Sequence, residues 1–153
     1  MNALEARIPP PVVGLLCAVL AWLVADLSGA SALPAQLRLS AALLLALLGL
    51  VISGAGVRAV RRAQSTLNPL KPETATALVT GGIFAYTRNP MYLGMATWLL
   101  AWAAWLGTLN ALSGPAAFVL YIGRFQILPE ERALAQLFGA AFTDYRARVR
   151  RWL

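Results

Sequence analysis

The sequence contains no histidine and only one cysteine, Cys17, among its 153 residues. The lack of histidine excludes His-ligated zinc and haem, serine or cysteine nucleophiles that depend on a histidine base, and histidine proton relays. A single cysteine also excludes an internal disulfide and a multi-cysteine metal site. We therefore expect a protein that works without a bound metal.

Charged residues are scarce as well. They make up 12% of the chain, while hydrophobic residues make up 59%; an ordinary soluble domain is about a quarter charged and about half apolar. A single soluble core of this length has no room to bury so much apolar surface. The composition predicts an integral membrane protein in which residues 1–153 form one membrane domain.

Four apolar runs are candidates for membrane spans, at about residues 12–27, 39–57, 92–106 and 111–128. The second run holds no charge over nineteen residues, and about 20 residues of helix cross the hydrocarbon of a bilayer. Only a short turn at 107–110 separates the last two runs, which predicts an antiparallel helical hairpin. Because strand-like alternation is absent, the predicted fold class is all-α, with four transmembrane helices.

The net charge of +7 comes from twelve arginines and one lysine. Most of these cations lie in the segment 58–91 or after the fourth run, Arg7 precedes the first run, Arg38 lies between the first two, and none lies in the turn at 107–110. By the positive-inside rule, the loop 58–91 and both termini are cytoplasmic, and the expected location is a bacterial inner membrane. We interpret this charge as topology and contact with membrane lipids rather than nucleic-acid binding. A cleaved signal peptide ending near Ala32 is a competing interpretation, disfavoured because Glu5 and three prolines make a poor positive leader.

The C-terminal residues 130–150 show a helical pattern. Apolar residues recur at three- and four-residue spacing and cations occupy the rest of the helical wheel; the apolar set is Leu134, Leu137, Phe138, Ala141, Phe142, Tyr145 and Val149. This pattern predicts an amphipathic helix on the cytoplasmic membrane surface, interrupted at Gly139.

Polar residues that carry chemistry lie in two places, the segment 58–94 and the junction 124–131. Gly81 and Gly82 permit backbone conformations closed to other residues. Asn89 precedes Pro90, so Asn89 is extended and Pro90 starts the third apolar helix. A helix start at the membrane surface offers free N–H groups to an anion such as a carboxylate.

Four motifs follow one another around the predicted hairpin: Thr-Gly-Gly-Ile-Phe at 80–84, Arg-Asn-Pro-Met-Tyr-Leu-Gly at 88–94, Pro-Glu-Glu-Arg-Ala-Leu at 129–134, and Phe-Gly-x-x-Phe-x-x-Tyr at 138–145. Together they resemble the isoprenylcysteine carboxyl methyltransferase and phospholipid N-methyltransferase superfamily, over residues 65–151. The resemblance implies an all-helical membrane enzyme that binds S-adenosylmethionine from the cytosol and methylates a lipophilic substrate from the bilayer. The isoprenylcysteine branch usually has Arg-His-Pro, whereas Asn89 resembles the phospholipid branch and small bacterial relatives. The acceptor therefore stays open among an isoprenylcysteine-like carboxylate, a phospholipid headgroup and a similar small group.

The resemblance also implies site residues. The candidate cofactor-binding residues are Gly81, Gly82, Tyr86, Asn89, Pro90, Tyr92, Leu93, Gly94, Glu130 and Glu131. The candidate catalytic residues are Arg88, Asn89, Tyr92 and Arg124. Adjacent helical residues point about 100° apart, so at most one of the two glutamates is expected to face the site squarely. The alternatives are structural: the glutamates as helix-start charges, and the arginines as membrane anchors that extend to the headgroups.

Methyl transfer is compatible with a chain that has no histidine and no multi-cysteine metal site. Methyl transfer from a sulfonium needs neither metal nor histidine, because its leaving group is already activated; it needs in-line approach and exclusion of water. A membrane reductase that uses NADPH on a related scaffold and a non-enzymatic membrane adaptor are the alternatives. A proton-coupled transporter is disfavoured, because every acidic residue lies at an edge of an apolar run or outside it. The sequence leaves the oligomeric state open.

Overall fold

The computed structural model describes residues 5, 7–27, 29, 31, 33–66 and 74–153. Within these residues every regular element is helical, which confirms the predicted all-α class. The elements are α1 (Pro10–Leu27), α2 (Ala35–Arg62), the 3₁₀ helix η2 (Gly82–Ala85), α3 (Pro90–Leu106), the 3₁₀ helix η3 (Leu109–Leu112), α4 (Ser113–Ile122), the π turn η4 (Gly123–Ile127) and α5 (Leu128–Arg148).

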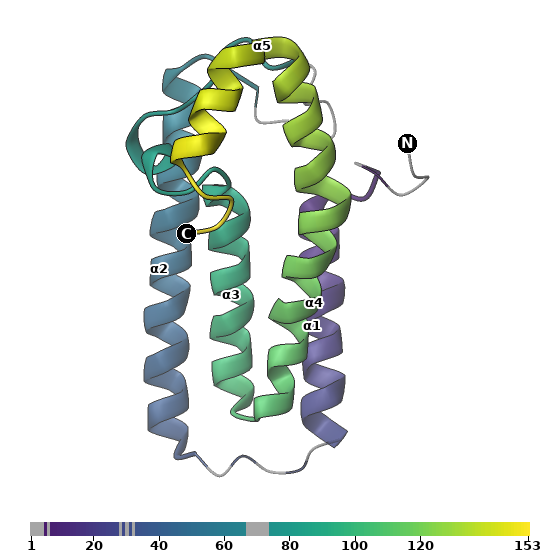
Figure 1. Ribbon diagram of the computed structural model, residues 1–153. Helices are drawn as coiled ribbons and strands as arrows, with labels where there is room; N and C mark the ends of the chain where they lie inside the picture. Colours follow the sequence, from purple (N-terminus) through teal and green to yellow (C-terminus); the bar gives the residue numbers. More distant parts are fainter. Residues whose placement is uncertain (1–4, 6, 28, 30, 32, 67–73) are drawn as a thin grey trace.

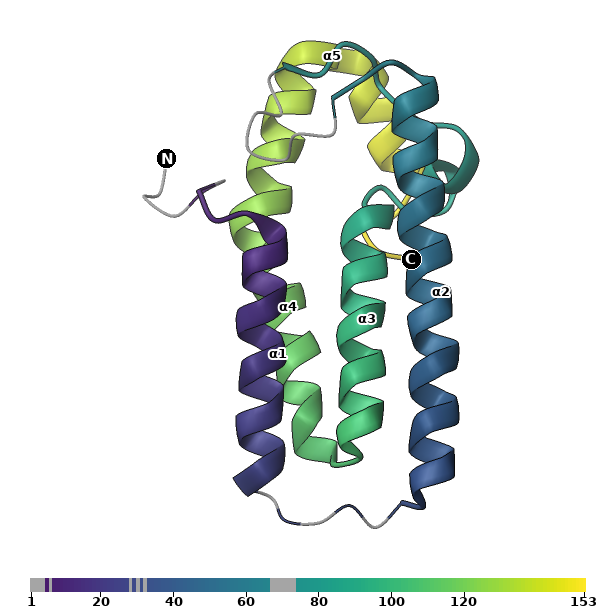
Figure 2. The same ribbon diagram turned by 180° about the vertical axis from the view of Figure 1, so that it is seen from behind.

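The long helices stand side by side, with α5 folded across one end of the bundle (Figure 1). The view from behind shows the same arrangement, with α3 next to α2 and α1 next to α4 (Figure 2). Three helical stretches are long and apolar enough to cross a membrane: α1, α2 and the run Leu109–Arg148. α3 has 17 residues. The first three predicted spans lie within α1, α2 and α3, while the predicted span 111–128 runs through η3, α4 and η4.

Small residues let α2 and α3 approach closely. A Cβ atom added at Gly94 would collide with the Ser53 Oγ, and one added at Gly49 would lie 2.8 Å from the Gly94 carbonyl oxygen. Glycine at these positions therefore allows backbone-to-backbone contact, as is common between helices in membranes. The opposite face of α2 exposes a series of apolar side chains, which include Leu44, Leu47, Leu48 and Val51. Such an apolar exposed face is expected of a helix in contact with lipid.

The junction between the fourth predicted span and the C-terminal helix is continuous. The π turn η4 ends directly before α5, and Pro129 lies in the first turn of α5. A proline ring inside a regular helix meets the carbonyl four residues earlier, and a π turn widens the helix at that point. The predicted interruption at Gly139 is confirmed: its φ of 51° and ψ of −122° are not helical, and α5 changes direction there.

The apolar face of α5 packs against the protein. Phe142 and Tyr145 are buried in one cluster with Val60 of α2 and Phe84 of η2. The prediction of an amphipathic helix on the membrane surface did not anticipate this contact, because an apolar stripe by itself does not specify whether lipid or protein covers it. The result is a helical cap over the end of the bundle.

Candidate functional site

A pocket lies beneath this cap, between the end of α2, the segment 75–79, η2, the start of α3 and both parts of α5 on either side of Gly139. It contains about 880 Å³ of space, part of which is open to solvent. Its polar lining is Ser65, Thr66, Arg88, Asn89, Tyr92, Glu130, Glu131 and Tyr145, and its apolar lining includes Val60, Leu78, Val79, Phe84, Met91, Leu134 and Phe142.

The pocket brings together some of the residues expected from the sequence and not others. The expected residues that line it are Arg88, Asn89, Pro90, Tyr92, Glu130 and Glu131. Those outside its lining are Gly81, Gly82, Tyr86, Leu93, Gly94 and Arg124. The apolar wall was missed as a ligand surface, although Phe142 and Tyr145 belong to the Phe-x-x-Tyr motif that the sequence analysis singled out.

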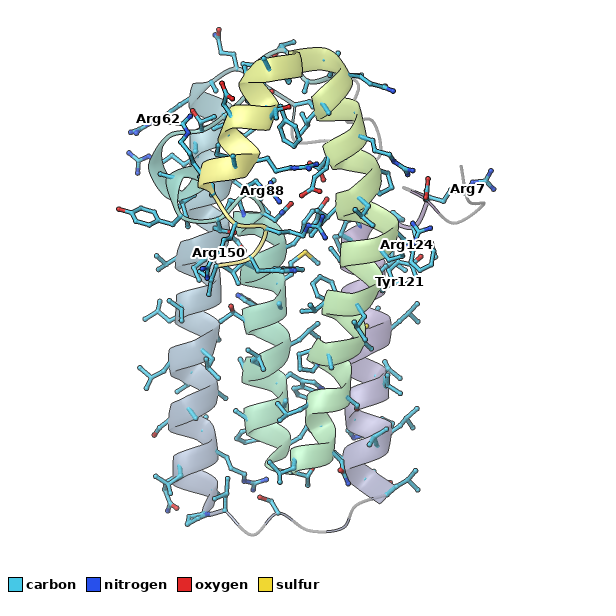
Figure 3. The ribbon with its side chains drawn as sticks, in the orientation of Figure 1. Arg7, Arg62, Arg88, Tyr121, Arg124 and Arg150 are labelled. Atoms are coloured by element: carbon cyan, nitrogen blue, oxygen red, sulfur yellow. The ribbon has the colours of Figure 1, made fainter. Side chains whose placement is uncertain are left out.

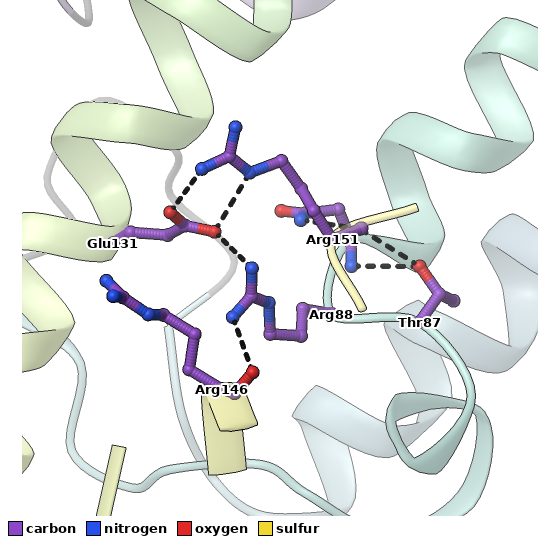
Figure 4. A network of polar contacts seen from close by, with 6 residues as sticks. Thr87, Arg88, Glu131, Arg146 and Arg151 are labelled. Atoms are coloured by element: carbon purple, nitrogen blue, oxygen red, sulfur yellow. Dashed lines mark hydrogen bonds and ion pairs between the residues drawn. The ribbon is translucent and has the colours of Figure 1, made fainter. Parts of the chain in front are cut away.

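Glu131 is held by two arginines (Figure 4). Arg88 donates from Nη2 to Glu131 Oε1 at 2.9 Å, and Arg151 donates from Nε to Oε1 at 3.1 Å and from Nη2 to Oε2 at 2.7 Å. The Arg88 and Glu131 side chains are each only 10% exposed. Charge-assisted forks of this kind are short and directional, so both oxygens of Glu131 are already engaged.

Glu130 has different surroundings. The Tyr92 hydroxyl donates to its Oε2 at 3.1 Å, and no arginine forms an ion pair with it among the described residues. Burial raises the pKa of Glu130 to about 7, with the neighbouring Glu131 charge adding to the rise and the Tyr92 hydrogen bond opposing it. This carboxylate therefore titrates near neutral pH and retains acceptor capacity on the pocket wall.

Arg88 retains donor capacity. Its Nη1 donates to the Arg146 carbonyl at 3.4 Å, while its Nε is buried and has no hydrogen-bond acceptor among the described residues. Burial lowers the pKa of Arg88 and the Glu131 carboxylate opposes that change. A buried donor without an acceptor is costly to a fold, which makes this pocket-lining side chain a candidate for ligand contact.

The residues before α3 donate hydrogen bonds to the carbonyls of Arg150 and Arg151. The Arg88 N–H donates to the Arg150 carbonyl at 3.1 Å. The Asn89 side-chain amide and the Thr87 hydroxyl donate to the Arg151 carbonyl at 3.0 and 3.3 Å. Asn89 precedes α3 with a φ of −131° and a ψ of 56°, so it does not have the extended conformation expected of a residue before proline. Its side chain does not cap the helix, and its amide instead binds the Arg151 carbonyl.

The glycines and Tyr86 lie at the periphery. Gly82 has a φ of 61°, a conformation that favours glycine, and it starts the turn η2 that places Phe84 in the pocket wall. The Tyr145 hydroxyl donates to the Phe84 carbonyl at 2.7 Å and secures that turn. The Tyr86 side chain is exposed to solvent, and Gly94 faces Ser53 of α2.

Arg124 lies away from the pocket, on the outer side of the bundle (Figure 3). Together with Arg132 it pairs with Glu5, at 3.1 and 2.6 Å. Hydrogen bonds from Arg124 and then Arg132 lower the pKa of Glu5. These ion pairs are not predictable from the sequence, because no local pattern links Glu5 to residues more than a hundred positions away.

Three comparisons with known proteins place this geometry in context. A family model described as phospholipid methyltransferase matches residues 37–141. The chain is 39% identical over 75 residues to the protein-S-isoprenylcysteine O-methyltransferase of Schizosaccharomyces pombe, covering 47% of this chain and 30% of that protein. It is 36% identical over 85 residues to the enzyme of the same name from Mus musculus, covering 52% of this chain and 28% of that protein.

A bacterial relative is shorter. An uncharacterized protein of Haemophilus influenzae is 46% identical over 63 residues, which cover 41% of this chain and all of that protein. The chain thus spans less than a third of the length of the two matched methyltransferases. No solved structure matches. No group of three or more cysteine, aspartate or glutamate side chains in the part of the chain described above is placed to hold a metal ion.

Proposed function

The chain belongs to the phospholipid methyltransferase family, and on this premise we propose that it transfers a methyl group from S-adenosylmethionine to a lipophilic acceptor in the membrane. The observation that carries the proposal is the pocket under the α5 cap. There Arg88 and Tyr92 meet Glu130 and Glu131, some forty residues apart in sequence, beside an apolar wall. The pocket lies at the arginine-rich end of an apolar bundle, where a water-soluble cofactor and a lipid can meet.

The pocket residues fit the charges of this cofactor. The buried Arg88 Nε lacks an acceptor among the described residues, and a carboxylate such as that of the methionyl group supplies one. Glu130 retains oxygen acceptors for an ammonium or for ribose hydroxyls. The apolar wall that includes Leu78 and Phe84 suits an adenine ring. We infer that Glu130 is the ligand-facing glutamate and that Glu131 orients Arg88.

The residues of the chain contribute by binding and orienting the cofactor. S-adenosylmethionine supplies a methyl group on a sulfonium, whose leaving group needs no further activation. The Tyr92 hydroxyl holds the Glu130 carboxylate at 3.1 Å, and the α5 cap limits access of water to the pocket. The part of Asn89 is structural: its side-chain amide donates to the Arg151 carbonyl and so fixes the backbone of the C-terminal residues beside the pocket.

We further propose four membrane crossings, with α3 as the third and α4 with η3 and η4 as the fourth. The 17 residues of α3 rise about 25 Å at 1.5 Å per residue, close to the hydrocarbon thickness. Arg7, Arg62, Arg88, Arg124 and Arg150 all lie toward the end of the bundle that carries α5 (Figure 3). This asymmetry supports a cytoplasmic pocket in a bacterial inner membrane, with an acceptor that enters from the bilayer between helices.

Calorimetric titration of the purified protein in detergent with S-adenosylhomocysteine tests the proposal, with NADPH as a parallel titrant. We expect micromolar binding of the first ligand, none of the second, and about tenfold weaker binding of the first in Glu130→Gln, because a charge-assisted contact is lost. Asp144→Asn removes an exposed carboxylate from the same helix and is the matched control. Binding of NADPH alone, or of neither ligand to folded protein, would overturn the proposal.

A further inference from the structure

Residues 149–153, here called the C-terminal strap, connect the two halves of the site. The strap carbonyls of Arg150 and Arg151 accept hydrogen bonds from the residues that precede α3. Val149 packs against the apolar cluster of the cap, and Trp152 packs against the bundle core of α1, α3 and α4. The strap therefore fixes the backbone of Arg151 from both sides, and the Arg151 side chain reaches Glu131 from a rigid position.

Two guanidinium groups share one carboxylate at this point. Glu131 Oε1 accepts from both Arg88 and Arg151, and Oε2 accepts from Arg151 alone. The three side chains carry one negative and two positive charges, so the group keeps a net positive charge. Arg88 and Glu131 line the pocket, whereas Arg151 is not part of its lining.

The net positive charge is available at Arg88. Only one of its nitrogens donates to Glu131, a second donates to a carbonyl, and its Nε has no acceptor within the described part of the chain. If Arg151 were absent, Arg88 and Glu131 would form a neutral pair and the Glu131 Oε2 would lose its donor. The charge that an anion meets at Arg88 thus depends on a residue that lies outside the pocket.

We propose that Arg151 is a positioning residue of this site: by sharing Glu131 with Arg88, it leaves the charge of Arg88 only partly neutralised, so that Arg88 can bind an anionic oxygen group of a ligand. That group is a carboxylate of the cofactor or a phosphate of a lipid headgroup, since both present charged oxygens to a guanidinium fork. The choice of the cofactor product as one probe rests on the proposed function, while the positioning role itself rests on the ion-pair geometry.

The test compares ligands with and without the anionic group. Wild-type protein, Arg151→Gln and Arg151→Lys are titrated in detergent with S-adenosylhomocysteine, with its decarboxylated analogue, and with short-chain phosphatidic acid. We expect Arg151→Gln to bind one anionic probe about tenfold more weakly while binding the decarboxylated analogue as wild type does. Arg151→Lys keeps the charge near Glu131 and restores most of the affinity. Arg150→Gln removes the same charge from an exposed neighbour and leaves all affinities unchanged.

Each outcome has a defined meaning. A loss confined to S-adenosylhomocysteine supports the proposal and identifies the carboxylate, while a loss confined to phosphatidic acid supports it and identifies the phosphate. Equal losses for S-adenosylhomocysteine and its decarboxylated analogue indicate general damage to the site and overturn the proposal, as does an equal effect of Arg150→Gln or no effect of Arg151→Gln. If wild-type protein binds phosphatidic acid, loses that affinity in Arg151→Gln, and does not bind S-adenosylhomocysteine, the proposed function fails and the positioning role stands.

Discussion

A single glutamate lies between two arginines at two places in the molecule, and the surroundings of the two clusters differ. Glu131 meets Arg88 and Arg151, whose side chains are 10% and 33% exposed. Glu5 meets Arg124 and Arg132, whose side chains are 46% and 58% exposed. Both carboxylates are nearly covered, at 10% and 3% exposure. The clusters therefore differ in how far solvent reaches the cations.

This difference decides what each cluster can do. Solvent reaches the half-exposed side chains of Arg124 and Arg132, so their charge is screened and their pairing contributes little to stability. Arg88 is shielded, and its charge acts at full strength on whatever enters the pocket. One glutamate with two arginines forms a surface ion-pair cluster in one case, and in the other it forms a cluster of which Arg88 and Glu131 line the pocket.

The largest expected effect is on stability. Replacing Glu131 by Gln leaves two guanidinium groups close together without their shared anion, and we expect a loss of about 3 kcal/mol in the free energy of unfolding. Glu5→Gln, the matched change in the exposed cluster, is expected to have a much smaller effect. Unfolding by denaturant in one fixed detergent measures both variants. Equal losses would show that the exposure of the arginines does not distinguish the clusters.

The next effect is on ligand binding. Arg88→Gln removes the pocket-lining cation while Arg151 continues to hold Glu131, and we expect about thirtyfold weaker binding of S-adenosylhomocysteine. Arg124→Gln is the matched control, and its binding is expected to equal that of wild type, because Arg124 lies outside the pocket. Calorimetric titration compares the two variants. Weaker binding in Arg124→Gln would restore Arg124 as a site residue.

Glu130 is a third carboxylate to compare, and it accepts a hydrogen bond from a tyrosine and, among the described residues, not from arginines. Burial raises the pKa of Glu130 to about 7, so its ionised fraction grows as pH rises through that value. If the ionised form binds a ligand ammonium, the affinity for S-adenosylhomocysteine increases about tenfold between about pH 6 and about pH 8. Glu130→Gln is expected to remove this dependence. A wild-type affinity that stays flat over this range would contradict the assignment.

The smallest expected effect is that of salt on the stability differences between wild type and the two glutamate variants. Raising the ionic strength to about 1 M shortens the screening length to about 3 Å, which weakens the exposed cluster first. The stability difference between wild type and Glu5→Gln is expected to shrink, while the difference between wild type and Glu131→Gln persists. Denaturant unfolding at low and high salt measures both differences, and a parallel decline would show that solvent ions reach the two clusters equally.

Much of the fold was predictable from the sequence, because apolar runs, prolines and glycines act locally. The runs at 12–27, 39–57 and 92–106 correspond to α1, α2 and α3, and the break at Gly139 follows from its position within a helical pattern. The continuity of the fourth span with α5 was not predictable, since Pro129 alone indicates a helix start. The π turn before Pro129 resolves this conflict.

The candidate site was predictable only in part. Motifs marked Arg88, Tyr92 and Glu130, which the tertiary structure brings to one pocket. They did not mark Arg151, whose role depends on a strap that folds back against the residues before α3. Nor did they place Arg124 beside Glu5. These contacts join residues distant in sequence, so no spacing rule reports them.

The sequence by itself determined that the chain is an apolar helical bundle with its cations gathered near a polar segment, because hydropathy and helix signals depend on a residue and its near neighbours. The tertiary structure decided which of two adjacent glutamates is engaged by arginines, which of these arginines lines the pocket, and what covers the apolar face of α5. Those outcomes depend on distances between residues that only the folded chain brings together.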